Sequence, residues 1–116
     1  MTNSPAARFS AGLLAGVFCA ALSAPALAAD AAAAQALAKR SNCFKCHAID
    51  KPKEAASWKE VAAKYKGKPD AQAKLTTHIT TGPKVKLEDG SEEQHPVIKT
   101  KKEDEIRNLV DWILSL

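Results

Sequence analysis

The sequence feature that most constrains the fold is a pair of cysteines followed at once by a histidine, in Cys43-Phe44-Lys45-Cys46-His47. Two thiols three positions apart lie on one helical turn, so both can bond to the vinyl groups on one side of a porphyrin. The imidazole of the next residue then lies under the iron, where it can bind as an axial ligand. The motif therefore predicts one covalently attached haem c, with Cys43 and Cys46 bonded to the porphyrin and His47 bound to the iron.

Three other uses of a C-x-x-C pair fit the sequence less well. A thioredoxin-like redox pair needs a βαβ context, which the surrounding sequence lacks. A zinc site would need four ligands, such as Cys43, Cys46, His78 and His95, but the 17 positions between the two histidines exceed the usual finger spacing. A disulfide within the motif would close a very small loop and would give the adjacent His47 no role.

The first thirty residues have the pattern of a secretory signal peptide. Arg8 is the only charged residue before position 30, and an apolar stretch covers residues 11–22. The small residues Ala26-Leu27-Ala28-Ala29 then form an A-x-A cleavage site. We expect residues 1–28 to be removed, Cys19 with them, and the protein to be periplasmic. The alternative is an uncleaved N-terminal anchor, for which the apolar stretch is short against the roughly 20 residues of a membrane span.

Residues 29–116 are expected to form one small domain. The whole chain has 17 basic and 13 acidic side chains, a net charge of +4, and loss of Arg8 with the signal peptide lowers this charge to +3. The charge is modest and spread along the chain, so it does not indicate nucleic-acid binding. A chain this short buries a modest core, and a cofactor would add to its stability. After signal cleavage we expect no membrane association, and a monomer or weak dimer.

Helical patterns cover most of this domain. Residues 31–41 are rich in Ala, Leu and Lys, which are good helix formers. A second helix begins at the capping box Ser57-Trp58-Lys59-Glu60 and ends near Lys66. A third follows Asp70 as its N-cap and ends at Gly82-Pro83.

The last helix opens with a second capping box, Thr100-Lys101-Lys102-Glu103. Residues 83–99, which precede it, have no regular apolar period, so we expect a long loop there. No segment after the signal peptide alternates as a strand, so the predicted fold class is all-α. One apolar face of the last helix is formed at helical spacing by Ile106, Leu109, Val110 and Ile113.

Three segments of the sequence resemble the class I cytochromes c, and most closely the small bacterial cytochrome c-551/c-552 group. They cover residues 38–50, which include the cysteine motif, residues 57–67 and residues 110–116. The resemblance extends over about residues 33–116 and implies a small cytochrome c fold, in which about four helices surround one covalently attached haem. It further implies that the first and last helices pack across each other beside the haem, with Leu37 and Trp112 at or near the crossing.

The chain departs from this family at two places. The family usually has Gly-Pro before the Ser-Trp segment, where the backbone supports the proximal imidazole, but this chain has Ala55 and Ala56. The departure predicts an altered hydrogen bond to that imidazole. The family's distal ligand is a Met in the loop before the last helix, usually followed by Pro, whereas this loop reads Glu92-Glu93-Gln94-His95-Pro96.

The distal iron ligand cannot be a methionine once the signal peptide is removed, because the only Met of the chain is Met1. His95 lies 48 positions after His47 and directly before a proline, close to where the resemblance places the family's Met. We therefore predict that His95 is the second axial ligand. The alternatives are an open iron with His95 in solvent, His78, which we expect to be exposed on its helix, and a deprotonated loop lysine such as Lys84, Lys86 or Lys99.

These features predict a monohaem electron-transfer cytochrome that is not an enzyme. Bis-His ligation predicts a lower potential than that of His/Met relatives, because a Met ligand raises the haem potential. Two further hypotheses are a haem protein that binds a gas at an open or displaceable distal site, and a dedicated subunit of one periplasmic oxidoreductase. Redox partner proteins are expected to dock through surface lysines near the haem edge, namely Lys39, Lys45, Lys51, Lys53, Lys84 and Lys86.

Overall fold

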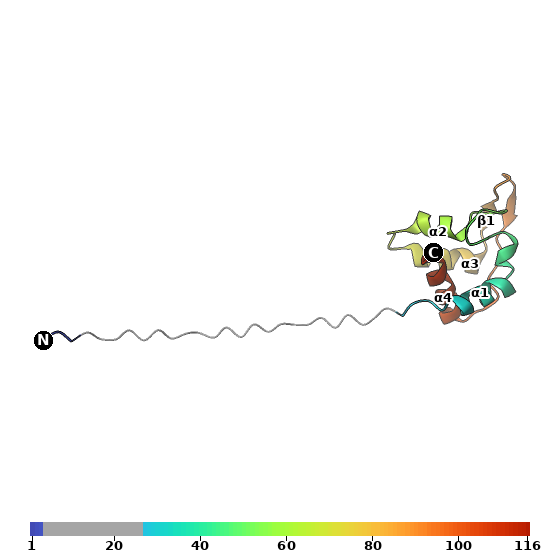
Figure 1. Cartoon of the computed structure of the whole chain (residues 1–116). Coiled ribbons are helices and arrows are strands. Elements are labelled where there is room, and N and C mark those ends of the chain that lie inside the picture. The colour runs from blue at the N-terminus through green and yellow to red at the C-terminus, as the bar shows by residue number, and fades with distance from the viewer. Residues whose placement is uncertain (4–26) are drawn as a thin grey trace.

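The computed structural model describes residues 1–3 and 27–116 of the chain. Most of the predicted signal peptide, residues 4–26, therefore lies outside the described residues. None of the described helices is long and apolar enough to cross a membrane. The elements are α1 (Ala31–Arg40), the 3-10 turn η1 (Cys43–Lys45), α2 (Trp58–Tyr65), α3 (Ala71–Thr81), β1 (Lys84–Lys86), β2 (Glu92–Gln94) and α4 (Glu103–Leu114) (Figure 1).

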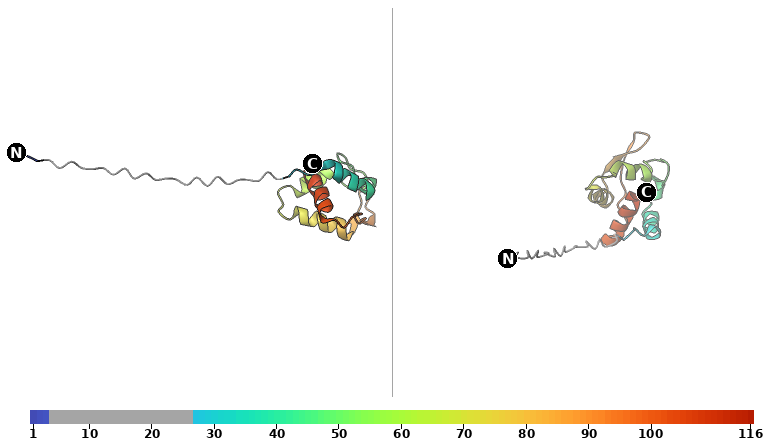
Figure 2. Two further views of the ribbon diagram at one scale, coloured as in Figure 1. Left: turned by 90° about the horizontal axis from the view of Figure 1, so that it is seen from below. Right: turned by 60° about the vertical axis from the view of Figure 1, so that its left-hand side comes forward.

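The four predicted helices are confirmed, and α4 is the element around which the others pack. It contacts α1, α2 and α3, and Figure 2 shows it lying between α1 and α3. The predicted apolar face of α4 is buried because positions i, i+3, i+4 and i+7 fall on one side of a helix with 3.6 residues per turn. Its members are Ile106, Leu109, Val110 and Ile113.

Aromatic rings connect this core to the cysteine motif. Leu37 of α1 and Trp112 of α4 belong to the same buried cluster, as expected for the crossing of these helices. The Trp112 ring meets Trp58 of α2 edge to face, with centroids 5.3 Å apart. Trp58 in turn meets Phe44 of η1 at 5.0 Å. Such pairs add stability beyond the apolar area that they bury, and here they hold the motif against the core.

The first predicted capping box is confirmed at the start of α2. The Ser57 hydroxyl accepts a hydrogen bond from the backbone N–H of Glu60 at 3.2 Å. The Glu60 carboxylate accepts one from the backbone N–H of Ser57 at 2.7 Å. Because Ser57 is 1% exposed, this cap is buried. It fixes the direction in which the chain enters α2.

The second predicted capping box is wrong. α4 begins at Glu103, and Lys102, which stands at the N-cap, makes no side-chain cap. The Thr100 hydroxyl instead accepts a hydrogen bond from the N–H of Lys102 two residues later, at 3.2 Å. This local turn competes with the cap for the same hydroxyl. The acidic side chains of the first turn, Glu103, Asp104 and Glu105, complement the positive end of the helix dipole instead.

The predicted loop over residues 83–99 contains an antiparallel hairpin, so the expectation of no strand is wrong. Lys84 pairs with Gln94 and Lys86 with Glu92. Each strand has only three residues, too few for an alternating pattern to stand out in the sequence. The backbone N–H of Glu88 in the hairpin loop donates to the Glu54 carbonyl at 2.9 Å. This bond ties the hairpin to the segment that follows the cysteine motif.

Replacement of Ser57 by Ala should lower the free energy of unfolding by about 1 kcal/mol, because the hydroxyl that caps α2 is lost. Urea denaturation followed by circular dichroism measures the change. Glu60→Gln is the matched control and should unfold near the wild-type midpoint, since Gln also completes a capping box. Equal unfolding free energies for wild type and Ser57→Ala would contradict the capping role.

Candidate functional site

The two cysteines and the histidine of the motif lie on one tight turn after α1. Asn42 starts this turn in the left-handed conformation, with φ of 60°, which Asn tolerates better than most residues. The backbone N–H of His47 then donates to the Cys43 carbonyl at 3.0 Å. The predicted grouping on one turn is therefore present, although the turn is a 3-10 helix and not an α-helix.

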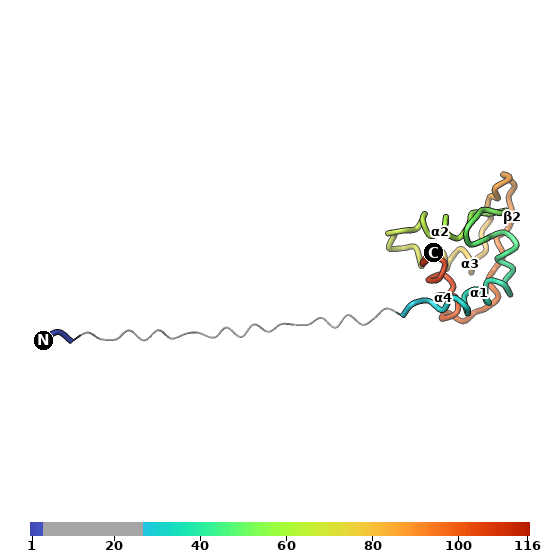
Figure 3. The backbone as a smooth tube through the Cα atoms, in the orientation of Figure 1, coloured from blue at the N-terminus to red at the C-terminus, as the bar shows by residue number. Residues whose placement is uncertain are grey.

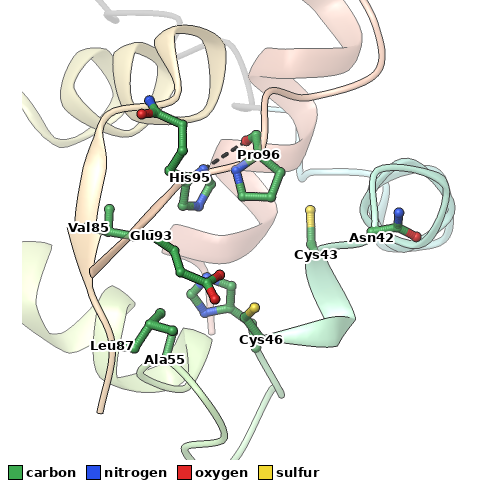
Figure 4. Close-up of a pocket in the computed structure, with 11 residues that line it drawn as sticks. Asn42, Cys43, Cys46, Ala55, Val85, Leu87, Glu93, His95 and Pro96 are labelled. Atoms are coloured by element: carbon green, nitrogen blue, oxygen red, sulfur yellow. Dashed lines mark hydrogen bonds between the residues drawn. The ribbon is translucent and has the colours of Figure 1, made fainter. Parts of the chain in front are cut away.

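Both thiols line one wall of a small hollow. Figure 4 shows Cys43 and Cys46 along this wall, facing Val85 and Leu87 of the hairpin across the hollow. Both cysteines are free. Burial raises the pKa of the Cys43 thiol. Burial also raises the pKa of Cys46, whose Sγ donates to the Glu54 carboxylate at 3.4 Å. Among the described residues, no group of three or more His, Cys, Asp or Glu side chains is placed to hold a metal ion, which disfavours the four-ligand zinc alternative.

The His47 imidazole is fixed by a backbone carbonyl and by an aromatic ring. Its Nδ1 lies 2.8 Å from the Ala56 carbonyl oxygen, so Nδ1–H donates and Nε2 is left with a free lone pair. The ring stacks on Trp58 at 5.6 Å between centroids. Burial lowers the pKa of His47 below its usual value, so the imidazole is neutral. A hydrogen bond to this imidazole is therefore present despite Ala55 and Ala56, because the acceptor is a backbone carbonyl that any residue supplies.

His95 follows β2 directly and is held by the end of α3. Its backbone N–H donates to the Pro83 carbonyl at 2.9 Å. Its Nδ1 lies 2.8 Å from the Pro96 carbonyl oxygen, the dashed line in Figure 4. As in His47, this hydrogen bond leaves Nε2 with a free lone pair. Burial lowers the pKa of His95, so this imidazole is neutral as well.

The His47 and His95 rings face each other across a gap. Their centroids are 6.4 Å apart and their planes are tilted by 51°. A metal ion that binds imidazole nitrogens at about 2.0–2.1 Å separates two such rings by roughly 6 Å between centroids. The observed separation therefore fits one metal ion between two histidines. The structure thus brings together His47 and His95, which are far apart in the sequence.

A second hollow opens on the other side of this histidine pair. It has a volume of about 300 Å³, is open to solvent, and is lined mostly by apolar side chains of α2, α3 and α4. Both hollows include His47 and His95 in their walls. Ligand sites of this size and apolar character are typical for organic cofactors. The residues therefore fit a flat group that extends from the thiols, between the two imidazoles, into the second hollow.

The alternative distal ligands occupy different places. His78 is not exposed as predicted. It is half-buried and its ring meets the His95 ring edge to face, with centroids 4.4 Å apart. Helical position alone gave no signal for this contact, which depends on where the 95–98 segment crosses α3. The loop lysines Lys84, Lys86 and Lys99 are exposed and line neither hollow.

Gly82 allows the close approach between α3 and the His95 backbone. It ends α3 with φ of +61°, and a Cβ there would lie 2.5 Å from the His95 carbonyl oxygen. The backbone N–H of Ile98 donates to the Ile79 carbonyl at 2.9 Å. The end of α3 thus contacts the segment that carries His95 both next to that residue and at Ile98. The Gly-Pro pair at 82–83 was a sequence signal for a helix end, and the structure adds this second role.

Sequence comparisons match most of the described domain to known proteins. Residues 31–116 match the family model described as Cytochrome c. Cytochrome c-551 of Pseudomonas aeruginosa is 33% identical over 81 residues, which cover 70% of this chain and 74% of that protein. Cytochrome c-552 of Nitrosomonas europaea is 35% identical over 80 residues, which cover 69% of this chain and 75% of that protein.

Solved structures are similar over the same region. The crystal structure of the class 1 cytochrome MtoD from Sideroxydans lithotrophicus ES-1 has a TM-score of 0.72 and 55% identity, and the match covers 76% of this chain and 97% of that chain. The wild-type cytochrome c552 of Nitrosomonas europaea has a TM-score of 0.58 and 30% identity, over 71% of this chain and 98% of that chain.

Replacement of Gly82 by Ala should destabilise the fold more than replacement of Gly67 by Ala. Both glycines have positive φ, so each alanine meets the left-handed strain of about 1 kcal/mol. Only at Gly82 does the new Cβ also collide with a backbone atom, since nothing lies within 4 Å of a Cβ at Gly67. Urea unfolding of the two variants measures the difference. Equal losses would show that the contact with His95 is not tight.

Proposed function

This chain belongs to the cytochrome c family, as a class I cytochrome with one covalently attached haem c, and we propose that it carries single electrons between redox proteins in the periplasm. In this proposal Cys43 and Cys46 hold the porphyrin through thioether bonds, and His47 and His95 are the two axial ligands of the iron. When bound, the haem supplies a one-electron couple between ferric and ferrous iron. We further propose that the protein is a carrier and not an enzyme.

The observation that carries the proposal is the facing pair of neutral imidazoles. His47 and His95 are 6.4 Å apart between ring centroids, and each Nδ1 is occupied by a backbone carbonyl. Each ring therefore presents Nε2, the nitrogen with a free lone pair, for a metal. The sequence supports the same ligand set, since Met1 is the only methionine and lies in the proposed signal peptide.

The two histidines suit electron transfer because the protein already holds both rings in place through backbone hydrogen bonds. The Nδ1 atom of each ring is hydrogen-bonded to a backbone carbonyl, that of Ala56 before α2 and that of Pro96 before α4. Such backbone acceptors have little conformational freedom to lose when a ligand binds. A histidine pair also lacks the thioether that raises the potential in His/Met cytochromes. We therefore propose a lower potential than in His/Met relatives.

Export of the chain is supported by the place where packing begins. The backbone N–H of Asp30 donates to the Asn108 side chain at 2.7 Å, and the Asn108 amide donates to the Asp30 carbonyl at 2.9 Å. Leu27, by contrast, is 99% exposed. Among the described residues, hydrogen bonds to α4 thus begin at Asp30, directly after the proposed cleavage site, so removal of residues 1–28 leaves these bonds intact. We propose that residues 29–116 are the working protein, a monomer or weak dimer.

The edge of the site between η1 and the hairpin is the proposed docking surface for a redox partner. Lys45 lies in η1, and Lys53 donates to the Phe44 carbonyl of the same turn at 2.7 Å. Both are exposed, as is Lys51 two positions before Lys53. Carboxylates lie close to them, since Glu54 contacts Cys46 and Figure 4 shows Glu93 extending into the hollow from the hairpin side. The surface therefore carries both signs of charge, and we propose a partner that matches this mixed pattern.

His95→Ala tests the distal ligand. The ferric haem protein should change from a low-spin to a high-spin absorption spectrum, and the ferrous form should bind carbon monoxide rapidly, because one axial position is vacated. Addition of imidazole is the control and should restore the low-spin spectrum. An unchanged spectrum would contradict ligation by His95. Rapid carbon monoxide binding by the wild-type protein would favour the gas-binding hypothesis instead.

His95→Met tests the effect of the ligand on the potential. A thioether at this position should raise the reduction potential above that of the wild type, because a Met ligand favours ferrous iron. Redox titration followed at the visible bands measures both proteins under the same conditions. A variant potential equal to or below the wild-type value, with a low-spin spectrum retained, would contradict the proposed low potential.

A further inference from the structure

The segment that carries His95 depends on the end of α3 for its position. In Figure 3 the chain passes from the hairpin at one end of the domain to the start of α4 at the other. Along this path it is bonded at two points, once to α3 and once to the chain just after α3. The N–H of His95 donates to the Pro83 carbonyl and the N–H of Ile98 to the Ile79 carbonyl, each at 2.9 Å. These bonds fix the backbone, but they do not fix the direction of the His95 ring.

The hydrogen bond of the ring itself is too local to orient it within the domain. His95 Nδ1 bonds to the carbonyl of Pro96, the next residue. The ring and its acceptor therefore belong to one segment and move together. An orientation relative to the rest of the domain needs a contact from another element.

His78 of α3 supplies such a contact. Its ring meets the His95 ring edge to face, with centroids 4.4 Å apart and planes at 65°. His78 also lines the larger hollow beside Leu75 and Ile79 of the same helix. Because α3 packs on α4, this ring is fixed to the core and not to the segment that it touches. Edge-to-face contact restricts rotation of His95 about its side-chain bonds.

We propose that His78 is a positioning residue that sets the orientation of the His95 ring relative to His47. The inference rests on the proposed function, in which His95 is an axial ligand. It assigns His78 no bond to the iron, since its ring meets His95 and not His47. The angle between the planes of two axial imidazoles determines the g-values of a low-spin ferric haem. Loss of the contact should therefore change the electron paramagnetic resonance spectrum while the iron stays low-spin.

Two variants of His78 in the haem-loaded protein test the proposal. His78→Ala removes the ring and should shift the g-values or broaden the signal. It should also speed carbon monoxide binding to the ferrous form about 2- to 10-fold, the range expected when one aromatic pair is lost. His78→Phe keeps a ring at the same position and should bring both properties back toward the wild type. Thr77→Ala is the matched control, because Thr77 is the exposed neighbour on the same helix.

Each contrary result points to one cause. Wild-type g-values and carbon monoxide rates in His78→Ala would overturn the positioning role, and so would a shift of equal size in Thr77→Ala. A high-spin spectrum in His78→Ala that imidazole returns to low-spin would overturn it too, by making His78 a ligand. The proposed ligation by His95 fails by a different result, namely a ferric spectrum of His95→Ala that stays low-spin. If His95→Ala becomes high-spin while His78→Ala matches the wild type, bis-His ligation holds and only this inference is wrong.

Discussion

The opposition of the His47 and His95 rings is the constraint on which the rest of the structure depends. The rings lie 6.4 Å apart between centroids, although 48 positions separate them in the sequence. A gap of this size matches the separation of two imidazoles bound to one metal ion, so small displacements of either ring would change what the site can bind.

Both rings are anchored by backbone carbonyls, which makes the site tolerant of side-chain changes around it. The acceptors are the carbonyls of Ala56 and Pro96. The Ala56 carbonyl lies just before the buried cap at Ser57. The Pro96 carbonyl lies in the segment that is hydrogen-bonded to the end of α3. The Ala55-Ala56 pair can thus replace the Gly-Pro of the related cytochromes without loss of the proximal hydrogen bond.

Local sequence patterns predicted the helices well and the connecting segments poorly. The apolar face of α4 and the cap at Ser57 were predictable because each depends on residues within one or two turns. The three-residue strands were missed because Val85 is the only apolar side chain among their six residues. The cap at Thr100 was mispredicted since a nearer N–H, that of Lys102, competes for its hydroxyl. His78 was placed on the surface because its contact comes from a segment 17 positions away.

The sequence by itself determined the C-x-x-C-H motif of residues 43–47 and the absence of methionine after the predicted signal peptide. These follow from residue identity and from spacings within a single turn, so no long-range contact can alter them. Only the tertiary structure decided that His95 faces His47, that the Ala56 carbonyl reaches the proximal ring, and that His78 packs on His95. Each of these joins residues separated by at least nine positions. Such distances are set by the packing of α1, α3 and α4, which is a property of the whole core.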